Sequence, residues 1–534
     1  MEINSIRIIG GGSAGWMTAA ALVTHLPHVD IRVIEDPNTP HIGVGESTLG
    51  FIRNYLDVIG LKDTDFMKAC NASYKLAIRF KNFYKKNNEA FYYPFGPYNM
   101  DGNQRGLNDW ALKKIYFPKT PLSDFADCVS PMMALVNENK LFENKDNKLP
   151  NFDFNHDVAF HFDSLQFAKW LKENICLPKG VIHVPQKLTS VKTNDKGIYE
   201  YVLDNQYWNP MKADLFIDCT GFSSRLLGGH LKEPFQSYED VLPNNCAWAT
   251  RIPYRNKKKE LVGYTDCEAI NNGWVWSIPL WSRLGCGYVF STKFISEEKA
   301  LVEFKEHLKS AKKLKDSEIN TLEFRKIPMR IGIHKRLWVK NVVAIGLSAG
   351  FIEPLESNGL YTVHEFIMVL LKVLKRSTTV SQFDKDCFNY RCKNIFDSFV
   401  DFVRFHYVLS HRDDTPYWRA ITNASNQEAF DNNETPWNYN LKMYAHHNMG
   451  HQSFDAGGGA AFIAAGMNFL PDNLPSLMYR EKHNPNLHNE EFEKYFSRRW
   501  DSSLINLSAK KLSWKKAVKN APSLYSFLKK RIYK

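Results

Sequence analysis

The chain has 534 residues, 44% of them hydrophobic, so it is long enough for one large composite fold or two to three domains around a substantial core. No stretch approaches the roughly 20 apolar residues of a membrane-spanning helix, and no signal peptide precedes the first apolar run, so we expect a soluble, cytoplasmic protein. The nine cysteines form no C-x-x-C pair, which disfavours a disulfide framework or a zinc site, and a net charge of +12 leaves an anionic ligand open.

The first predicted elements form a strand, a glycine loop, a helix and a second strand. Residues 6–9 are predicted to be a buried strand, 16–25 a helix, and 31–34 a strand ending at Glu35. The loop has the G-x-G-x-x-G spacing, and its candidate cofactor contacts are Gly10, Gly12, Ser13, Ala14 and Gly15. Such a loop lets a pyrophosphate approach the helix N-terminus, and the acid binds ribose hydroxyls. The pattern predicts a dinucleotide site. It disfavours a 2′-phosphate and leaves FAD and NAD both open.

The next segments carry a second glycine-punctuated loop and a basic strand. Gly43, Val44, Gly45 and Glu46 lead into a predicted helix over 49–59. Residues 74–83 alternate as a strand with Lys75 on the same face as other cations, a pattern typical of a solvated lysine. Residues from about 84 to 155 are rich in Asn, Asp, Pro and aromatics, which indicates inserted loops and short helices. A helix over 164–173 and strands over 181–192, 197–203 and 215–219 follow.

Two tryptophans two residues apart mark the segment Gly273-Trp274-Val275-Trp276-Ser277-Ile278-Pro279. On an extended strand this spacing puts both rings on one face, where they form a flat aromatic wall that can partition a cavity. A pair of core tryptophans in a sheet is the alternative interpretation.

A late strand-glycine-helix unit repeats the opening pattern. Residues 341–345 are predicted to be a buried strand that runs into Gly346-Leu347-Ser348-Ala349-Gly350, and a helix over 358–375 follows. This return predicts a split nucleotide domain that completes one cofactor site. We therefore expect an α/β (α+β) fold, with a Rossmann-like sheet domain over 1–385 and an added helical domain over 386–534.

The C-terminal segment from Ser508 to Lys534 carries nine Lys and Arg residues and no acid. Such a tail could bind phosphates, which leaves a nucleic-acid-associated or flavin-binding scaffold protein as one alternative. No known nucleic-acid motif accompanies it. We favour an amphipathic terminal helix whose apolar residues pack on the body: Leu512, Trp514, Val518, Leu524, Phe527 and Leu528.

Several of these motifs together resemble the flavin-dependent halogenases of the tryptophan halogenase family. They are the glycine fingerprint with Trp16, the Gly43–Glu46 loop, Lys75 in its strand, the Gly273–Pro279 segment, and Phe351-Ile352-Glu353-Pro354-Leu355-Glu356-Ser357-Asn358-Gly359. Residues 410–418 and 460–471 look family-like as well, so the resemblance covers nearly the whole chain. The W-x-W-x-I-P segment is its most diagnostic element.

The resemblance implies a flavin monooxygenase-type sheet domain that binds FAD, with a helical domain added to it. In this family reduced FAD (FADH2), oxygen and a halide, chloride or bromide, give hypohalous acid, which passes through a tunnel to an aromatic substrate. Trp274, Trp276, Ile278 and Pro279 would separate the substrate from the flavin. A flavin-dependent hydroxylase, the alternative function, needs its substrate against the flavin, so this barrier favours halogenation.

The resemblance also assigns roles to single residues. Lys75 matches the catalytic lysine, which activates the oxidant by hydrogen bonding or carries it as a haloamine. Glu356 matches the acid that stabilises the arenium cation or accepts its proton, and Ser357 links the flavin and substrate sides. Backbone N–H groups of Asn358 and Gly359 would hold the halide. Leu347 is a further flavin contact, and Glu353, a second carboxylate, is interpreted as structural.

Substrate and partners follow from the same comparison. Tyr93 and Phe95 match positions that sandwich the arene, but residues 443–452 lack the family's tryptophan clamp, so we expect an indole or phenol rather than free tryptophan. The histidines of this region, His446, His447 and His451, are interpreted as a polar loop, not a metal site. No second nucleotide motif is present, so FADH2 would come from a separate NAD(P)H-dependent reductase. We expect no nucleic-acid, membrane or metal partner, and a homo-oligomer is compatible with the sequence.

Overall fold

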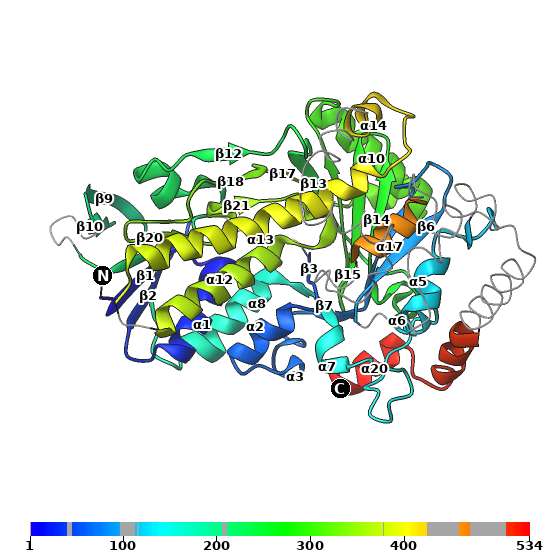
Figure 1. Ribbon diagram of the computed structural model, residues 1–534, viewed down its shortest axis with the longest axis horizontal. Coiled ribbons are helices and arrows are strands. Elements are labelled where there is room, and N and C mark those ends of the chain that lie inside the picture. The colour runs from blue at the N-terminus through cyan, green and yellow to red at the C-terminus, as the bar shows by residue number, and fades with distance from the viewer. Residues whose placement is uncertain are drawn as a thin grey trace, which may run out of the picture.

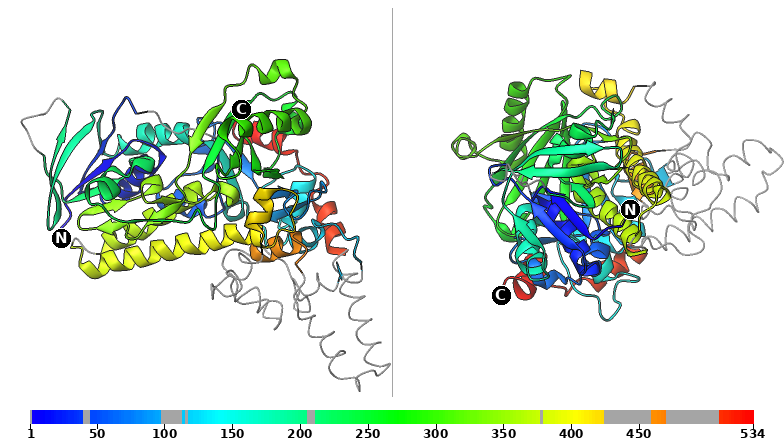
Figure 2. Two further views of the ribbon diagram at one scale, coloured as in Figure 1. Left: turned by 90° about the horizontal axis from the view of Figure 1, so that it is seen from above. Right: turned by 90° about the vertical axis from the view of Figure 1, so that its left-hand side faces the viewer.

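The computed structural model describes residues 2–39, 45–96, 113–114, 117–204, 211–376, 379–423, 459–469 and 509–534. A mostly parallel sheet lies at one end of the molecule and a large antiparallel sheet at the other (Figure 1). The long helix α13 (Gln382–Val408) runs along the molecule beside both (Figure 2).

The sheet at the N-terminal end is the nucleotide-binding type that the sequence predicts. It has six strands in the order β19-β20-β11-β1-β2-β8, parallel except for β19. In that order the strands are β19 (Trp338–Val339), β20 (Val342–Ala344), β11 (Leu215–Asp218), β1 (Ser5–Ile9), β2 (Asp30–Ile34) and β8 (Ile182–Val184). Because β20 pairs with β11, the chain does return late to complete this sheet, and the α/β fold class is confirmed.

Helices pack against this sheet and against one another. α1 contacts both α8 and α12, elements that follow it by more than 100 residues. These helices are α1 (Ser13–His25), α8 (Ser164–Leu171) and α12 (Gly359–Arg376). Asp163, the N-cap residue of α8, accepts a hydrogen bond from the Gln166 N–H.

The second large sheet holds the tryptophan strand near its centre. Its order is β17-β13-β16-β15-β14-β5-β6, antiparallel except between β14 and β5. In that order the strands are β17 (Arg325–Pro328), β13 (Cys246–Ile252), β16 (Leu284–Phe290), β15 (Gly273–Pro279), β14 (Tyr264–Ile270), β5 (Ala77–Lys81) and β6 (Ala90–Pro94). Every residue of β15 is buried, since the strand has neighbours on both edges and packed layers on both faces.

Three further sheets are small. The sheet β3-β7-β4 matters most for the site, with β3 (Gly45–Ser47), β7 (Ala159–Asp163) and β4 (Ser73–Lys75). The other two are β12-β18-β21 and the pair β10-β9. Their strands are β12 (Phe235–Ser237), β18 (Gly332–His334), β21 (Gly350–Phe351), β9 (Leu188–Asn194) and β10 (Gly197–Leu203).

The predicted single strand over 74–83 is wrong, because it is two strands in two different sheets. β4 ends at Lys75 and β5 begins at Ala77, in the seven-stranded sheet. Between them the Leu76 N–H donates to the Gly263 carbonyl at 2.7 Å, and the Leu76 carbonyl accepts from the Phe95 N–H at 2.8 Å. The prediction over 181–192 likewise merges β8 and β9 of separate sheets. Alternating apolar residues do not reveal which sheet a strand joins.

Apart from α10, which has 16 residues, the remaining helices are short. Three of them, α5, α6 and α7, lie in the 84–155 region, where short helices were predicted. The α-helices not yet named are α2 (Ile52–Val58), α3 (Asp63–Phe66), α5 (Asp124–Val129), α6 (Met132–Asn137), α7 (Phe154–Asp157), α9 (Lys257–Glu260), α10 (Glu297–Lys312), α11 (Asp316–Ile319), α14 (Pro416–Ile421), α17 (Gly459–Gly466) and α20 (Leu524–Arg531). Among the described residues, no helix combines the length and apolar character needed to cross a bilayer.

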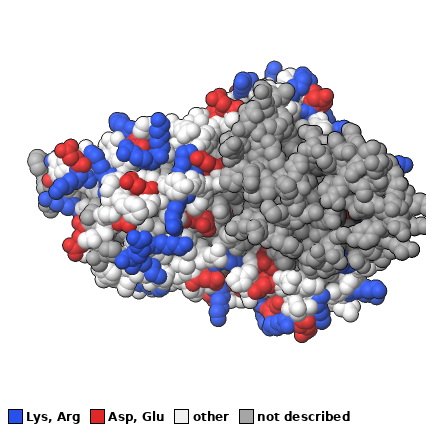
Figure 3. Space-filling view, viewed as in Figure 1, with Lys and Arg blue, Asp and Glu red and all other residues white. Residues whose placement is uncertain are grey.

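The basic C-terminal segment packs on the body. Trp514, Val518, Leu524 and Leu528 are buried and Phe527 is partly buried against the core, whereas Leu512, predicted to pack, is 60% exposed. Several cations of the segment form ion pairs with acids of the body, among them Lys511–Asp127, Lys515–Glu138 and Arg531–Asp63. Basic and acidic side chains are interspersed over the described part of the face in Figure 3.

Candidate active site

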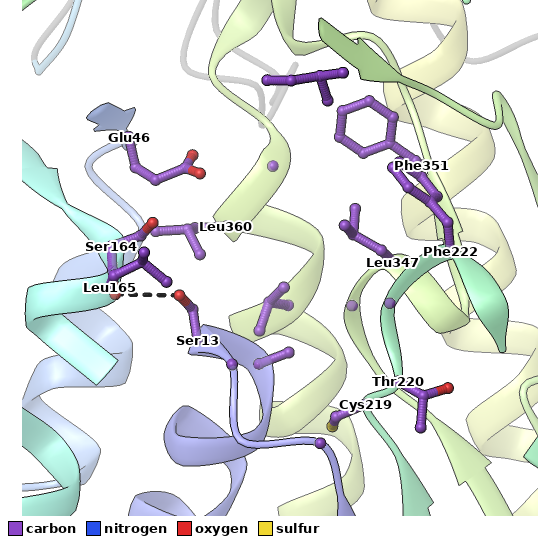
Figure 4. Close-up of a pocket in the computed structure, with 18 of the residues that line it drawn as sticks. Ser13, Glu46, Ser164, Leu165, Cys219, Thr220, Phe222, Leu347, Phe351 and Leu360 are labelled. Carbon is purple, nitrogen blue, oxygen red and sulfur yellow. Dashed lines mark hydrogen bonds between the residues drawn. The ribbon is translucent and has the colours of Figure 1, made fainter. Parts of the chain in front are cut away.

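A cavity of about 460 Å³ lies between the glycine loop and the antiparallel sheet. Of the predicted cofactor contacts, Gly10, Gly12, Ser13, Ala14 and Glu35 line it. Leu347 and Glu46 line it from other parts of the chain, and Ser13 donates a hydrogen bond to the Ser164 carbonyl at its edge (Figure 4). Gly15 packs behind the loop, and Gly43 and Val44 lie outside the described residues.

The glycine loop has the close approaches that its spacing predicts. Gly10 has φ +114°, and a Cβ there would lie 2.2 Å from the Cys219 carbonyl oxygen. A Cβ on Gly15 would lie 1.9 Å from the Gly10 carbonyl oxygen, so helix and strand pack without side chains between them. The first turn of α1 carries no acid, which leaves its N–H groups and positive dipole end for an anion. This cradle fits the pyrophosphate of FAD.

The cavity wall near the late glycine loop carries one acidic residue in an apolar setting. Glu46 ends in the cavity beside Leu360 (Figure 4), where burial and the nearby Asp163 charge raise its pKa to about 7. Gly346, Gly359 and Leu360 come from the second glycine unit and complete this side. One cavity is thus built from segments more than 300 residues apart, as the split nucleotide domain predicts.

Trp274 and Trp276 both line this cavity, so their spacing does place them on one side of β15. Their ring centroids are 6.2 Å apart and the planes are inclined by 58°, so the wall is not flat. Gly287 on the neighbouring strand makes room for the Trp276 indole, since a Cβ at that position would lie 2.0 Å from the ring. Ile278 lines the cavity too, while the Pro279 carbonyl accepts a hydrogen bond from Ser73 behind it.

Lys75 is fully buried, so its interpretation as a solvated lysine is wrong. Its ammonium donates to Ser357 Oγ at 2.8 Å and to the Thr48 carbonyl at 2.9 Å, and lies 4.7 Å from the centre of the Phe95 ring. Burial lowers the pKa of Lys75 to about 7, and the charges of Glu356 and Cys267 oppose that shift. The amine is therefore near its titration midpoint at neutral pH.

Glu356 is also fully buried, beside a histidine that the sequence analysis missed. His406 Nε2 on α13 lies 2.7 Å from Glu356 Oε1, which is within hydrogen-bonding distance. Burial raises the pKa of Glu356, while His406 and then Lys75 lower it. His406 is a buried histidine in a helix rich in aromatics, a pattern that does not distinguish it from a core residue.

Ser357 connects Lys75 to the cavity. Ser357 lines the cavity, whereas Lys75 and Glu356 do not belong to the described residues that line it. Ser357 has the left-handed backbone conformation, φ 60° and ψ 33°, that is uncommon for a residue with a side chain. This turn ends the short helix Pro354–Glu356 and lets α12 begin at Gly359.

Asn358 and Gly359, the predicted halide contacts, stand at the start of α12. Asn358 is 2% exposed, and neither polar atom of its side chain has a hydrogen-bond partner among the described residues. The N–H groups of the first turn of a helix have no partner within the helix. This is a setting in which an anion can bind.

Glu353 belongs to a separate buried network. Its carboxylate accepts from the Asn244 side chain at 2.5 Å, and the same amide reaches the hydroxyls of Tyr407 and Tyr417 at 3.1 and 3.0 Å. Burial raises the pKa of Glu353 to about 7. These contacts connect the loop before Glu356 to α13 and α14, which agrees with the interpretation of Glu353 as a structural residue.

Aromatic side chains pack near Lys75 and Glu356. Tyr93 and Phe95 pack edge to face at 5.6 Å, and Tyr93 also contacts Phe402 and stacks on Phe462. Phe402 and Phe462 were not predicted from the sequence. The histidines at 446, 447 and 451 lie outside the described residues.

Comparison with known proteins gives a consistent result. A family model described as tryptophan halogenase matches residues 5–478. Tryptophan 6-halogenase ThaL of Streptomyces albogriseolus is 31% identical over 508 residues, which cover 90% of this chain and 92% of that protein. Tryptophan 7-halogenase RebH of Lentzea aerocolonigenes is 34% identical over 438 residues, 78% and 79% of the two chains. The apo structure of VirX1 superposes with a TM-score of 0.88 and 39% identity over 100% of both chains.

Proposed function

The chain belongs to the tryptophan halogenase family and is a flavin-dependent halogenase, and on this premise we propose that it halogenates an electron-rich arene held beside Lys75 and Glu356. The observation that carries the proposal is the placement of these two groups. Both are fully buried, each acts on the pKa of the other, and Ser357, which lines the large cavity, follows Glu356 in the chain and accepts a hydrogen bond from Lys75.

The large cavity would hold FAD. The loop Gly10–Gly15 would hold the pyrophosphate, Glu35 the ribose, and Gly45, Glu46 and Leu347 would contact the flavin end. Bound FAD, when reduced, supplies the electrons with which oxygen converts chloride or bromide into hypohalous acid. Asn358 and Gly359 would hold the halide at the start of α12. Trp274 and Trp276 keep the arene out of this cavity, and the oxidant would reach Lys75 through a tunnel.

Lys75 and Glu356 divide the chemistry at the arene. Lys75 can donate an N–H to the oxidant oxygen as an ammonium, or take the halogen as an amine, because its pKa is lowered to about 7. Glu356 is a fully buried carboxylate, so it would stabilise the positive charge of the arenium cation and then accept the ring proton. His406 holds Glu356 in place from the far side.

We propose an indole or a phenol as the substrate. Tyr93, Phe95, Phe402 and Phe462 support this class, since aromatic faces and edges pack well against a flat electron-rich ring. The named relatives are tryptophan halogenases. This substrate class excludes free tryptophan, because residues 443–452 lack the sequence with which the family holds tryptophan. These residues lie outside the described part of the chain.

A separate NAD(P)H-dependent reductase would supply FADH2 by diffusion. The purified chain with NADH and free FAD alone should then form no product. Addition of a reductase should start turnover.

The test is the mass of the product formed from an indole or phenol with reductase, oxygen and either bromide or chloride. We expect a halogenated arene whose mass follows the halide supplied, and no product in halide-free buffer. A hydroxylated product that forms equally without halide would show that the chain is a monooxygenase instead.

A further inference from the structure

A chain of hydrogen bonds leads from Lys75 into the small sheet behind it. Lys75 donates to Ser357 Oγ at 2.8 Å, and Ser357 donates to Ser47 Oγ at 3.0 Å. Ser47 Oγ lies 2.6 Å from Thr265 Oγ1, which lies 2.9 Å from His161 Nε2. The path continues from His161 Nδ1 to Ser73 Oγ, 3.2 Å away, and ends at the Pro279 carbonyl, 2.5 Å from that hydroxyl.

Strand register places these groups together. In the sheet β3-β7-β4, His161 is paired with Ser47 on one side and with Ser73 on the other, so the three side chains share one face. Lys75 follows Ser73 by two residues on β4 and lies on that face too. Thr265 enters from β14 of the large sheet. All six side chains are buried, at 5% exposure or less.

The Pro279 carbonyl at one end, together with a neutral His161, sets the direction of every hydrogen bond along this path. A carbonyl oxygen can only accept, so Ser73 must give its single O–H proton to Pro279 and accept from His161 Nδ1–H. Neutral His161 then has a lone pair at Nε2 and accepts from Thr265. Thr265 in turn accepts from Ser47, and Ser47 accepts from Ser357. Ser357 is left with lone pairs only toward Lys75.

We propose that His161 is a positioning residue for halogenation, which acts through Thr265, Ser47 and Ser357 to keep the Ser357 hydroxyl an acceptor toward Lys75. This inference rests on the proposed function of Lys75.

The orientation matters because a serine beside an amine would otherwise donate its proton to the nitrogen lone pair. Here Ser357 Oγ and the Thr48 carbonyl each accept one N–H of Lys75. The third position on the nitrogen, an N–H in the ammonium or a lone pair in the amine, is left for the oxidant. The chain therefore serves either of the two roles open to Lys75.

The proposal also requires His161 to stay neutral. Burial, and then the charge of Lys75, hold the pKa of His161 well below its ordinary value. The ionisable groups that act on Lys75 are Glu356 and Cys267. If His161 took up a proton, Nε2 would become a donor, Thr265 and Ser47 would reverse, and Ser357 would point its proton at Lys75.

The direct test reads the tautomer of His161 from 15N spectra of the full-length protein labelled in histidine, with the His161→Gln spectrum as the assignment. At pH 7 we expect the neutral form protonated at Nδ1, with Nε2 as acceptor. The Nε2–H tautomer or a doubly protonated ring would overturn the proposal. This readout needs no turnover, so it stands apart from the test of the halogenase function itself.

A matched pair of variants at Thr265 tests the consequence for catalysis. Thr265→Val keeps the shape but removes the hydroxyl, and Thr265→Ser keeps the hydroxyl. At saturating FAD we expect Thr265→Val to lower kcat roughly tenfold with the KM for the arene unchanged, and Thr265→Ser to stay within about twofold of the parent protein. Equal kcat in parent and Thr265→Val, or an equal loss in both variants, would refute the positioning role.

Discussion

At the scale of single residues, the site depends on ionisable side chains that are buried away from water. Lys75, Glu356 and His406 are all fully buried, and burial shifts the pKa of the lysine down and that of the glutamate up. Both groups are therefore moved toward neutral pH, where proton acceptance by the carboxylate and either role of the amine are available.

Removal of His406 is predicted to change the pKa of Glu356 in one direction. It lowers the pKa of Glu356, which burial alone raises, so its removal should raise that pKa further. Glu356 acts as a base, and activity is lost as the pH falls through its pKa. In His406→Phe we expect the acid limb of the kcat profile to move to higher pH.

The conservative variant is the control for this prediction. His406→Gln keeps an N–H donor near Glu356 and should shift the limb less than His406→Phe does. A lower kcat with an unmoved acid limb in His406→Phe would mean that His406 only fills space in the helix.

At the scale of elements, the barrier depends on a glycine of the strand next to it. β16 passes beside β15, and the absence of a side chain at Gly287 leaves the volume that the Trp276 indole occupies. The two tryptophans of β15 can therefore form the barrier only if the residue opposite Trp276 is small. A packed interior has no room for both the indole and a second side chain at that place.

Gly287→Ala should displace Trp276 into the cavity proposed for FAD. Overpacking of this kind costs about 1–3 kcal/mol, so we expect the Kd for FAD, measured by flavin fluorescence, to rise roughly tenfold. Gly285→Ala on the same strand is the matched control, since a Cβ there would have its nearest neighbour at 3.6 Å. Equal FAD affinities in the two variants would contradict the packing argument.

Elements that depend on local sequence could be predicted, while those that depend on long-range pairing could not. The glycine loop, α1 and the tryptophan strand are specified by short-range spacing, and the structure has them where the spacing puts them. The break at Leu76 depends on Gly263, and the path from Ser47 to Ser357 joins residues 310 positions apart. Register between distant strands, which brings His161 beside Ser47 and Ser73, is not encoded in any one segment.

At the scale of the whole molecule, the chain ends by packing against its own beginning. The Tyr533 ring stacks on Trp281 with centroids 4.0 Å apart. Arg531 contacts Asp63, Glu143 and Tyr74, and Tyr74 directly precedes Lys75. The C-terminal segment thus supports the strands that carry the site. The division into two domains between residues 385 and 386 stays a proposal. That boundary falls within the first turn of α13, which begins at Gln382.

Deletion of residues 524–534 should therefore lower stability rather than merely remove charge. Leu524 and Leu528 are fully buried, and their loss exposes core surface. We expect the apparent Tm to fall by roughly 5 °C or more, measured by differential scanning fluorimetry. Lys529→Ala with Lys530→Ala, at exposed positions, should leave it unchanged. An equal fall in both proteins would point to a role of charge instead.

The central claim is that the oxidant forms at one place and is used at another, and Lys75→Ala tests it most directly. With reductase, FAD, oxygen and bromide, the variant and parent protein are compared for two products: the halogenated arene, and hypohalous acid captured by a soluble scavenger. We predict that Lys75→Ala binds FAD normally and still yields scavenged oxidant, but forms no halogenated arene. Loss of both products together with intact FAD binding, or an undiminished yield of halogenated arene, would contradict this account.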